Sequence, residues 1–243
     1  MTLSLLPFLR SDRPGEGVAV LETTTENVVR SWVDGWIVSR LAAPPVVEPW
    51  GYTIDVGVGG HVTRHVFDAT GDAVREADVR KVAGAVRAEG TWLKVFADPA
   101  VVSPWLGPDW WIDDEPGYLM TVPLAPSPAH RLTAPDGYRL RTWTRGGVVR
   151  AMVTDASGAL AARGQTVPLG PTAVVDQIET DPGHRRRGLG SLVMRALATA
   201  AAEQGAQTGV LAGTPDGHAL YTALGWRVLA PLTSAKYLGP RGR

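Results

Sequence analysis

The sequence predicts a mixed α/β protein in which helices flank a largely antiparallel sheet. Runs of β-prone residues are separated by short glycine turns, such as Gly59-Gly60 and Gly146-Gly147, which is typical of antiparallel hairpins. Other segments place apolar residues at helical spacing. One of these, residues 189–204, lies between strands predicted at 172–180 and 208–212, and such a crossover makes the two strands parallel.

The first predicted helix covers residues 24–41. Thr23 and Glu26 have the spacing of a capping box, and prolines 44 and 45 end the pattern. Its apolar stripe includes Trp32 and Trp36, which we interpret as core residues.

A hairpin and a helix follow in the N-terminal half. Strands are predicted at Tyr52–Val58 and His61–Asp68, then a helix at 76–87 and a strand at 92–97. His61 and His65 would be about 13 Å apart on a strand, too far to share a metal ion, so no metal site is expected there.

The segment Pro104–Tyr118 is rich in proline and glycine, which predicts a loop. It combines tryptophans with carboxylates. Aromatic faces and carboxylates both attract ammonium groups, so one interpretation is a binding site for a cationic substrate. The other is that the tryptophans hold a long loop to the core while the carboxylates face water. The candidate substrate residues are Trp110, Trp111, Asp113 and Asp114.

A proline-rich stretch without apolar periodicity, residues 125–136, is interpreted as a linker. It divides the chain into an N-terminal α/β domain, 1–124, and a C-terminal domain, 137–243. The elements expected in the second domain are strands at 138–144, 148–154, 159–167, 172–180 and 208–212, helices at 189–204 and 217–224, and a final strand pair at 226–229 and 234–238.

Composition restricts the function classes. Basic and acidic residues number 24 each, and this balance indicates no nucleic-acid or anionic-membrane partner. Cysteine is absent, which excludes disulfides, cysteine nucleophiles and thiolate metal ligands. No apolar run approaches the roughly 18 residues of a membrane span, and the cytoplasm is the expected location.

The most informative motif is the run from Ile178 to Ser191, where a strand ends and a helix begins. Arg185, Arg186 and Arg187 precede Gly188 and Gly190 at the start of the helix. A helix N-terminus offers unpaired N–H groups and a partial positive charge, and glycine lets a ligand approach the backbone. The order of strand, basic turn and helix predicts a phosphate or pyrophosphate site.

This run resembles the acetyl-CoA signature of the GNAT superfamily of N-acetyltransferases, in the form Arg185-x-x-Gly188-x-Gly190. A second stretch, from Thr214 to Trp226, is similar to the family pattern of Asn-x-x-Ala, Tyr and Gly-Phe. Tyr221 and Gly225 match it, while Thr214, Gly217 and Trp226 replace the usual residues. The resemblance covers about residues 137–238.

The resemblance implies an acyl-CoA-dependent enzyme that needs no metal, with acetyl-CoA as the donor. The pyrophosphate would bind the backbone near the helix start, and the pantetheine arm would pair with the preceding strand. An amine would attack the thioester directly, and Tyr221 would protonate the leaving thiolate. The implied cofactor-binding residues are Ile178, Glu179, Thr180, Arg185, Arg186, Arg187, Gly188, Leu189, Gly190, Ser191 and Thr214.

Two carboxylates on the motif strand, Asp176 and Glu179, are candidates for the base that deprotonates the amine. Three positions separate them, so regular strand geometry predicts that they face opposite sides of the sheet.

The sequence departs from the family in one respect. Relatives place two helices between their first two strands, whereas here only residues 145–147 separate strand 138–144 from strand 148–154. We expect the N-terminal half to cover the acceptor side instead. One interpretation makes that half a degenerate copy of the same fold, without the arginines and glycines of a second cofactor site.

Three functions remain open from the sequence. The preferred one is acetylation of a small-molecule amine, and the alternatives are a peptide or protein N-acetyltransferase and a non-catalytic acyl-CoA sensor. A homodimer is also left open.

Overall fold

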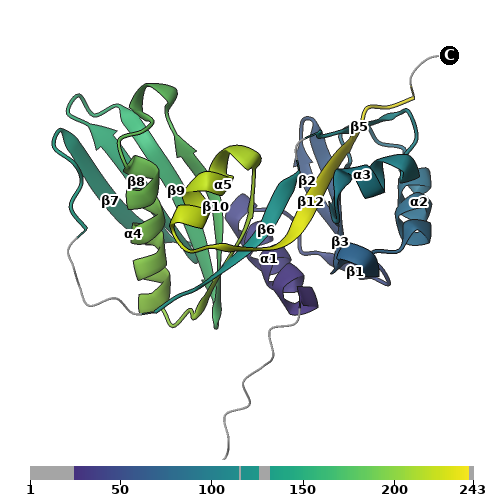
Figure 1. Cartoon of the computed structure of the whole chain (residues 1–243), viewed down its shortest axis with the longest axis horizontal. Coiled ribbons are helices and arrows are strands. Elements are labelled where there is room, and N and C mark those ends of the chain that lie inside the picture. Colours follow the sequence, from purple (N-terminus) through teal and green to yellow (C-terminus); the bar gives the residue numbers. More distant parts are fainter. Residues whose placement is uncertain (1–24, 115, 126–131, 241–243) are drawn as a thin grey trace, which may run out of the picture.

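The computed structural model describes residues 25–114, 116–125 and 132–240 (Figure 1). In this part of the chain twelve strands join one sheet, in the order β1-β2-β3-β4-β12-β6-β11-β10-β9-β8-β7, with β5 paired to β12 outside that path. The strands are β1 (Val46–Glu48), β2 (Gly51–Val58), β3 (His61–Thr70), β4 (Trp92–Phe96), β5 (Trp110–Ile112), β6 (Gly117–Pro123), β7 (Tyr138–Arg145), β8 (Val148–Asp155), β9 (Leu160–Leu169), β10 (Thr172–Thr180), β11 (Thr208–Gly213) and β12 (Arg227–Tyr237).

Helices flank this sheet in both halves of the chain. The α-helices are α1 (Thr25–Arg40), α2 (Glu76–Ala85), α3 (Pro99–Val102), α4 (Leu189–Glu203) and α5 (Pro215–Ala223). Three short 3-10 turns accompany them: η1 (Gly71–Ala73), η2 (Ser103–Trp105) and η3 (Pro182–His184).

The two halves repeat one topological pattern. In the first half, α2 connects β3 to a parallel β4, and in the second, α4 connects β10 to a parallel β11. A further helix and a long strand then follow in each half, α3 and β6 with the short strand β5 between them, and α5 and β12. This shared order of strand, helix, strand, helix and strand supports the interpretation of the N-terminal half as a degenerate copy.

The last strand of each half pairs with the other half. β6, from the first half, lies antiparallel to β11, and β12, from the second half, lies antiparallel to β4. β6 and β12 also pair with each other at the centre of the sheet, where Figure 1 shows them crossing between the two halves. Hydrogen bonds therefore cross the predicted division of the chain in both directions.

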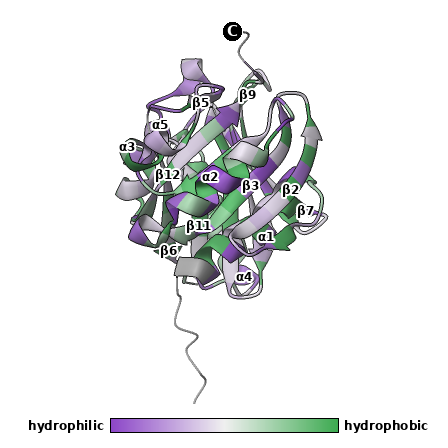
Figure 2. Cartoon of the chain, turned by 90° about the vertical axis from the view of Figure 1, so that its right-hand side faces the viewer, coloured by the Kyte–Doolittle hydropathy of each residue, from purple (hydrophilic) through white to green (hydrophobic). Residues whose placement is uncertain are grey.

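A shared core lies beneath α1 and includes residues from both halves. The buried face of α1 carries the two tryptophans that were expected in the core, each 4 % exposed. Its partners in this core include Tyr52, Ile54, Val66 and Phe96 from the first half, and Val174, Val210, Ala230 and Leu232 from the second. Separate cores lie under α4 and under α2, and Figure 2 shows hydrophobic and hydrophilic residues alternating along α2 and the strands behind it.

Most of the predicted elements are confirmed. The three long helices occur within two residues of the predicted bounds, and β10 and β11 are parallel as expected. The hairpin at Gly146-Gly147 joins β7 to β8 with no intervening helix, and α1 packs on β9, β10 and β11. The capping box at Thr23 and Glu26 lies outside the described side chains.

Two expectations are wrong. The predicted strand pair at 226–229 and 234–238 is one long strand, β12, with an irregularity between Val228 and Ala230. The two ends of this strand pair with different neighbours, which a local sequence pattern does not indicate. The predicted loop 104–118 contains the strand β5, which forms because β12 offers it a free edge.

The predicted linker, 125–136, lies partly outside the described residues. The division into 1–124 and 137–243 follows the order of the sequence, whereas the sheet places β6 beside the second half and β12 beside the first.

Gly35 on α1 provides a test of the shared core. A Cβ at this position would overlap the side chain of Val174 on β10, so Gly35→Ala should push the helix off the sheet. We expect a loss of about 1–3 kcal/mol in the free energy of unfolding, the usual cost of overpacking. Gly84→Ala is the matched control, because a Cβ at this exposed position in α2 meets nothing within 4 Å, and it should stabilise by about 0.5–1 kcal/mol. Denaturant unfolding measures both, and equal effects would contradict close packing of α1.

Candidate functional site

The sheet forks between β10 and β11. These strands pair only from Thr172 and Thr208 to Val174 and Val210. Beyond that point β10 continues beside β9, while β11 continues beside β6. The edge of β10 that faces β11 is therefore open over residues 178–180, and its backbone groups are available to a ligand.

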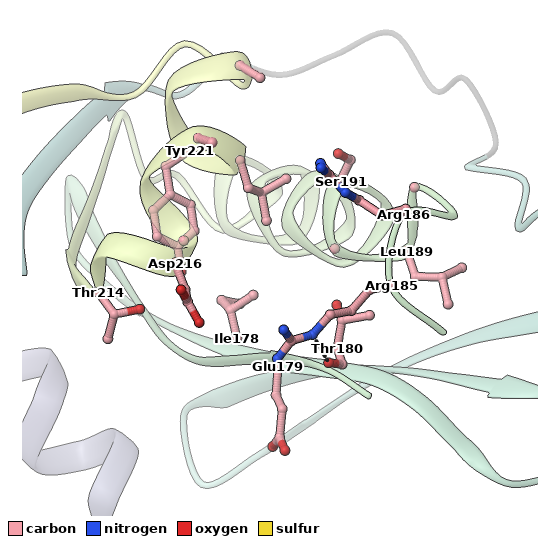
Figure 3. Close-up of a pocket in the computed structure, with 16 residues that line it drawn as sticks. Ile178, Glu179, Thr180, Arg185, Arg186, Leu189, Ser191, Thr214, Asp216 and Tyr221 are labelled. Carbon is pink, nitrogen blue, oxygen red and sulfur yellow. Dashed lines mark hydrogen bonds between the residues drawn. The ribbon is translucent and has the colours of Figure 1, made fainter. Parts of the chain in front are cut away.

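A cavity of about 840 Å³ opens at this fork (Figure 3). It lies between the end of β10, the turn that follows, the start of α4, and α5. Of the predicted cofactor-binding residues, all but Arg187 line it: Ile178, Glu179, Thr180, Arg185, Arg186, Gly188, Leu189, Gly190, Ser191 and Thr214. Tyr221 lines it as well, together with Asp216, Gly217, Ala219, Leu220 and Ala223, of which the sequence had assigned no ligand role to the last five.

The basic turn is held in one conformation by local contacts. Asp181 accepts a hydrogen bond from the Gly183 N–H at 2.8 Å. The Tyr138 hydroxyl lies 2.9 Å from His184 Nδ1 and accepts from Arg187 at 2.9 Å. Arg187 therefore anchors the turn, which explains why it does not line the cavity.

The start of α4 has the features of an anion site. Arg186 and Gly188 have left-handed backbones, with φ of 61° and 76°. When left-handed and right-handed backbone conformations alternate in this way, successive N–H groups point toward one position. No side chain of the described residues caps the helix, so its first-turn N–H groups face the cavity with the partial positive charge of the helix end.

A β-bulge in β10 overturns the expectation that Asp176 and Glu179 face opposite sides of the sheet. The register with β9 shifts between these two residues, and Gln177 has a left-handed φ of 54°. The one inserted residue shifts the alternation of side chains along β10, so that both carboxylates lie on the same face of the sheet. Asp176 is paired across the ladder with Gln165, and Glu179 with Arg163, two positions along β9 and therefore on the same side.

Both carboxylates are engaged in ion pairs on that side. Asp176 accepts from Arg40 at 2.6 and 2.8 Å and from the Ser39 hydroxyl at 2.6 Å. Glu179 accepts from Arg163 at 2.8 Å, and Figure 3 shows its side chain directed away from the cavity. Glu179 therefore contributes backbone to the cavity wall, and Asp176 lies beyond the fork on the face covered by α1.

Tyr221 occupies a position that two glycines make available. A Cβ at Gly213 or Gly217 would lie 2.7 or 2.6 Å from the tyrosine ring, so both positions require glycine for this ring placement. The ring is 8 % exposed. Burial, assisted by the negative charge of Asp176, raises the pKa of Tyr221 to about 12. Its hydroxyl is therefore protonated at neutral pH.

A second, smaller cavity of about 150 Å³ meets the first at Thr214, which lines both. We call it the cationic cavity. Its walls come from α1, β3, β4, β10 and the end of β11, and its ionisable side chains are Arg40, Arg64, Lys94, Asp113 and Asp176. Sequence reasoning missed the three cations, because single basic residues on a helix and two strands of the other half carry no motif.

The four candidate substrate residues do not lie together in the structure. Asp113 lines the cationic cavity. Trp110 is buried against Tyr237 at a ring distance of 5.3 Å, and lines neither cavity. Trp111 is 42 % exposed and packs edge-on against Trp92 at 6.1 Å, while Asp114 is exposed. The segment thus supplies one carboxylate to the cavity and no aromatic cage.

No group of three or more metal-binding side chains occurs among the residues that the structure describes. None of their helices is long and apolar enough to cross a membrane.

Comparisons with known proteins agree with this geometry. Residues 109–226 match the model of the acetyltransferase (GNAT) family. The search of curated proteins gave no match. Among solved structures, a GCN5-related N-acetyltransferase from Kribbella flavida is similar over 89 % of this chain and 96 % of its own, with 17 % identity and a TM-score of 0.61.

Two other solved structures are similar over most of the chain. A Drosophila protein covers 87 % of this chain and 88 % of its own, at 11 % identity and a TM-score of 0.51. A putative GNAT acetyltransferase from Novosphingobium aromaticivorans covers 88 % and 97 %, at 19 % identity and a TM-score of 0.49. The family match covers the open edge of β10, the basic turn and Tyr221, and it identifies residues 109–226 as an acetyltransferase (GNAT) domain.

Proposed function

We propose that the protein transfers the acetyl group of acetyl-CoA to the amine of a small molecule. The observation that carries the proposal is the fork between β10 and β11, where an open strand edge leads to an uncapped helix start. A long donor with amides at one end and a pyrophosphate at the other fits this combination. The cavity of about 840 Å³ has room for an elongated ligand.

Different residues along the cavity would bind different parts of acetyl-CoA. The first-turn N–H groups of α4, with Arg185 and Arg186, would hold the pyrophosphate. The backbone of β10 at residues 178–180 would pair with the pantetheine amides as an added strand. Acetyl-CoA supplies the thioester carbonyl and a thiolate leaving group. A backbone N–H at the bulge would stabilise the oxyanion that develops on that carbonyl.

Tyr221 is the proposed proton donor. Its hydroxyl is neutral at physiological pH, so it would donate a hydrogen bond to the sulfur as the carbon–sulfur bond breaks. An ordinary thiol has a pKa of about 8.5, so full transfer of the tyrosine proton is uphill, and the tyrosinate would be reprotonated by the proton that the attacking amine loses. The amine nitrogen bonds to the acyl carbon as the carbon–sulfur bond breaks. Asp176 is the better placed of the two candidate bases, because it lies on the acceptor side while Glu179 points away.

The experiment that tests the function combines acetyl-CoA with a panel of small amines and of peptides carrying free N-termini or lysines. Thiol release reports turnover, and mass spectrometry identifies the product. Acetylated small amines support the proposal. Acetylation of peptides alone assigns the protein to the peptide acetyltransferases, and acetyl-CoA binding without thiol release for any acceptor makes it a sensor.

If the start of α4 binds the pyrophosphate, titration calorimetry should find one acetyl-CoA site per chain. The Gly188→Val variant should bind acetyl-CoA more weakly. The new side chain would enter the space beside the helix start, at a φ of 76° that a β-branched residue resists. We expect a loss of affinity of at least about fivefold, from a strain on the order of 1–2 kcal/mol. Gly170→Val is the control: it has a φ of 56° and open space, but it lies in the β9–β10 turn outside the cavity. Equal affinities of the two variants would place the pyrophosphate elsewhere.

Tyr221→Phe tests the proton donor. The substitution removes only the hydroxyl, so the turnover number should fall by roughly 10²–10⁴-fold, the usual contribution of general acid catalysis, while acetyl-CoA affinity stays within about twofold. Tyr237→Phe alters another buried tyrosine, far from the cavity in the core under α2, and should leave turnover intact. Wild-type turnover in Tyr221→Phe would reduce this residue to a packing role.

A further inference from the structure

The cationic cavity lies where an acceptor would approach the fork. It meets the cofactor cavity at Thr214, and Asp176, which lines it, is close enough to Tyr221 to raise the pKa of the hydroxyl. α1 forms one wall with Trp32 and Trp36, and strands of the N-terminal half form another. A group bound here would lie across the sheet from the donor, with its reactive end toward the fork.

Arg64 is the central feature of this cavity. Its side chain comes from β3, is 8 % exposed overall, and stacks on Trp36 with 3.9 Å between the guanidinium carbon and the ring centroid. Nε donates to His61 Nε2 at 3.2 Å. Burial and the charge of Arg64 lower the pKa of His61 to about 4, so this partner is neutral. Among the described residues no carboxylate lies within ion-pair distance of Arg64, and the two terminal nitrogens have no hydrogen-bond acceptor.

Lys94 adds a second buried cation from β4. Nζ donates to the Ser234 hydroxyl at 2.6 Å and lies 4.9 Å from the Trp92 ring centroid. Burial, with the positive charge of Arg64, lowers the pKa of Lys94 well below its ordinary value, and the carboxylate of Asp113 opposes this shift. An anion between Lys94 and Arg64 would relieve their mutual repulsion.

Basic side chains outnumber carboxylates among the described residues that line the cavity. Arg40, Arg64 and Lys94 stand against Asp113 and Asp176. Arg40 and Asp176 neutralise each other in a two-point ion pair, and the negative charge of Asp113 acts on Lys94. Burying a cation without a counter-ion is costly, and the described part of the chain supplies no counter-ion to Arg64. Burial of the guanidinium, opposed by Asp176 and reinforced by Arg40, lowers its pKa to about 9.

We propose that the cationic cavity binds a carboxylate of the acceptor, so that the substrate is a small amino acid or a similar amine that carries one carboxylate. The planar fork of a guanidinium matches a carboxylate in two hydrogen bonds. This excess of basic side chains and a space of about 150 Å³ suit a single carboxylate better than a larger dianionic phosphate. The proposal rests on the proposed function, and it adds a carboxylate to the cationic substrate that was one interpretation of the sequence.

The test compares acids with their uncharged amides. Acceptors are glycine, β-alanine, γ-aminobutyrate and L-phenylalanine, each paired with its carboxamide, and kcat/KM is measured with saturating acetyl-CoA. The wild-type protein should prefer at least one acid over its amide by roughly 10- to 100-fold, the range for hydrogen bonds to a charged group. Equal rates for all acid and amide pairs would overturn the proposal.

Two variants then test whether the cationic cavity causes the preference for the acid over the amide. Arg64→Met keeps the length of the side chain and removes the charge, so it should lower kcat/KM for the acid and leave the amide unchanged. Lys94→Met should act in the same direction, and serves as the second probe if Arg64→Met unfolds. Arg30→Met is the matched control on α1, since Arg30 is exposed and pairs with Asp34. Equal losses for acid and amide in both cavity variants would contradict carboxylate binding.

Binding measurements separate this inference from the proposed function. Trp32 and Trp36 line the cavity, so quenching of tryptophan fluorescence by the same acids and amides reports occupancy without turnover. Arg64-dependent quenching by acids alone, with no acetylation, supports the carboxylate site and rejects acetyl transfer. Acetylation of amines irrespective of a carboxylate supports acetyl transfer and rejects the site. Neither quenching nor acetylation with any probe rejects both.

Discussion

The separation of β10 from β11 is the constraint on which both cavities depend. The two strands share a short parallel ladder and then follow different neighbours, because β9 continues to hold β10 while β6 holds β11. The open backbone of β10 lies between them. On one face of the fork the start of α4 and Tyr221 line the larger cavity, and on the other α1 and the N-terminal strands form the cationic cavity.

The exchange of β6 and β12 keeps this fork in place. β6 would be an edge strand of the first half and β12 of the second if each remained with its own half. Instead each covers the open edge of the other half, and their mutual pairing makes one sheet. The N-terminal half is thereby fixed against the catalytic half, and its β3 and β4 can place Arg64 and Lys94 beside Asp176. A freely jointed pair of domains could not hold these charges around one cavity.

The bulge at Gln177 connects the backbone to the chemistry. By inserting one residue it turns Asp176 and Glu179 to the face covered by α1, and it interrupts the ladder next to the open edge. Asp176 then pairs with Arg40 and lies near Tyr221 across the fork, whereas Glu179 pairs with Arg163 away from the cavity. The left-handed conformation of a non-glycine residue is a local cost, and its position beside the site is typical of functional regions.

The sequence by itself determined most of the helices and strands and the parallel crossover, and it predicted an anion site at the start of α4. These depend on neighbouring residues: apolar spacing within one element, glycines in one turn, and arginines directly before one helix. Tyr221 was found in the same way, through a local stretch that resembles a family pattern. Only the tertiary structure decided that β12 is one strand serving two halves, that β5 pairs with it, and that the bulge puts both carboxylates on one face. It also brought Arg64, Lys94 and Asp113 together, since the three are distant in the sequence and each belongs to a different strand or turn. The charge of the cationic cavity depends on such long-range packing, because the sequence around each of these residues does not indicate which other residues will lie beside it.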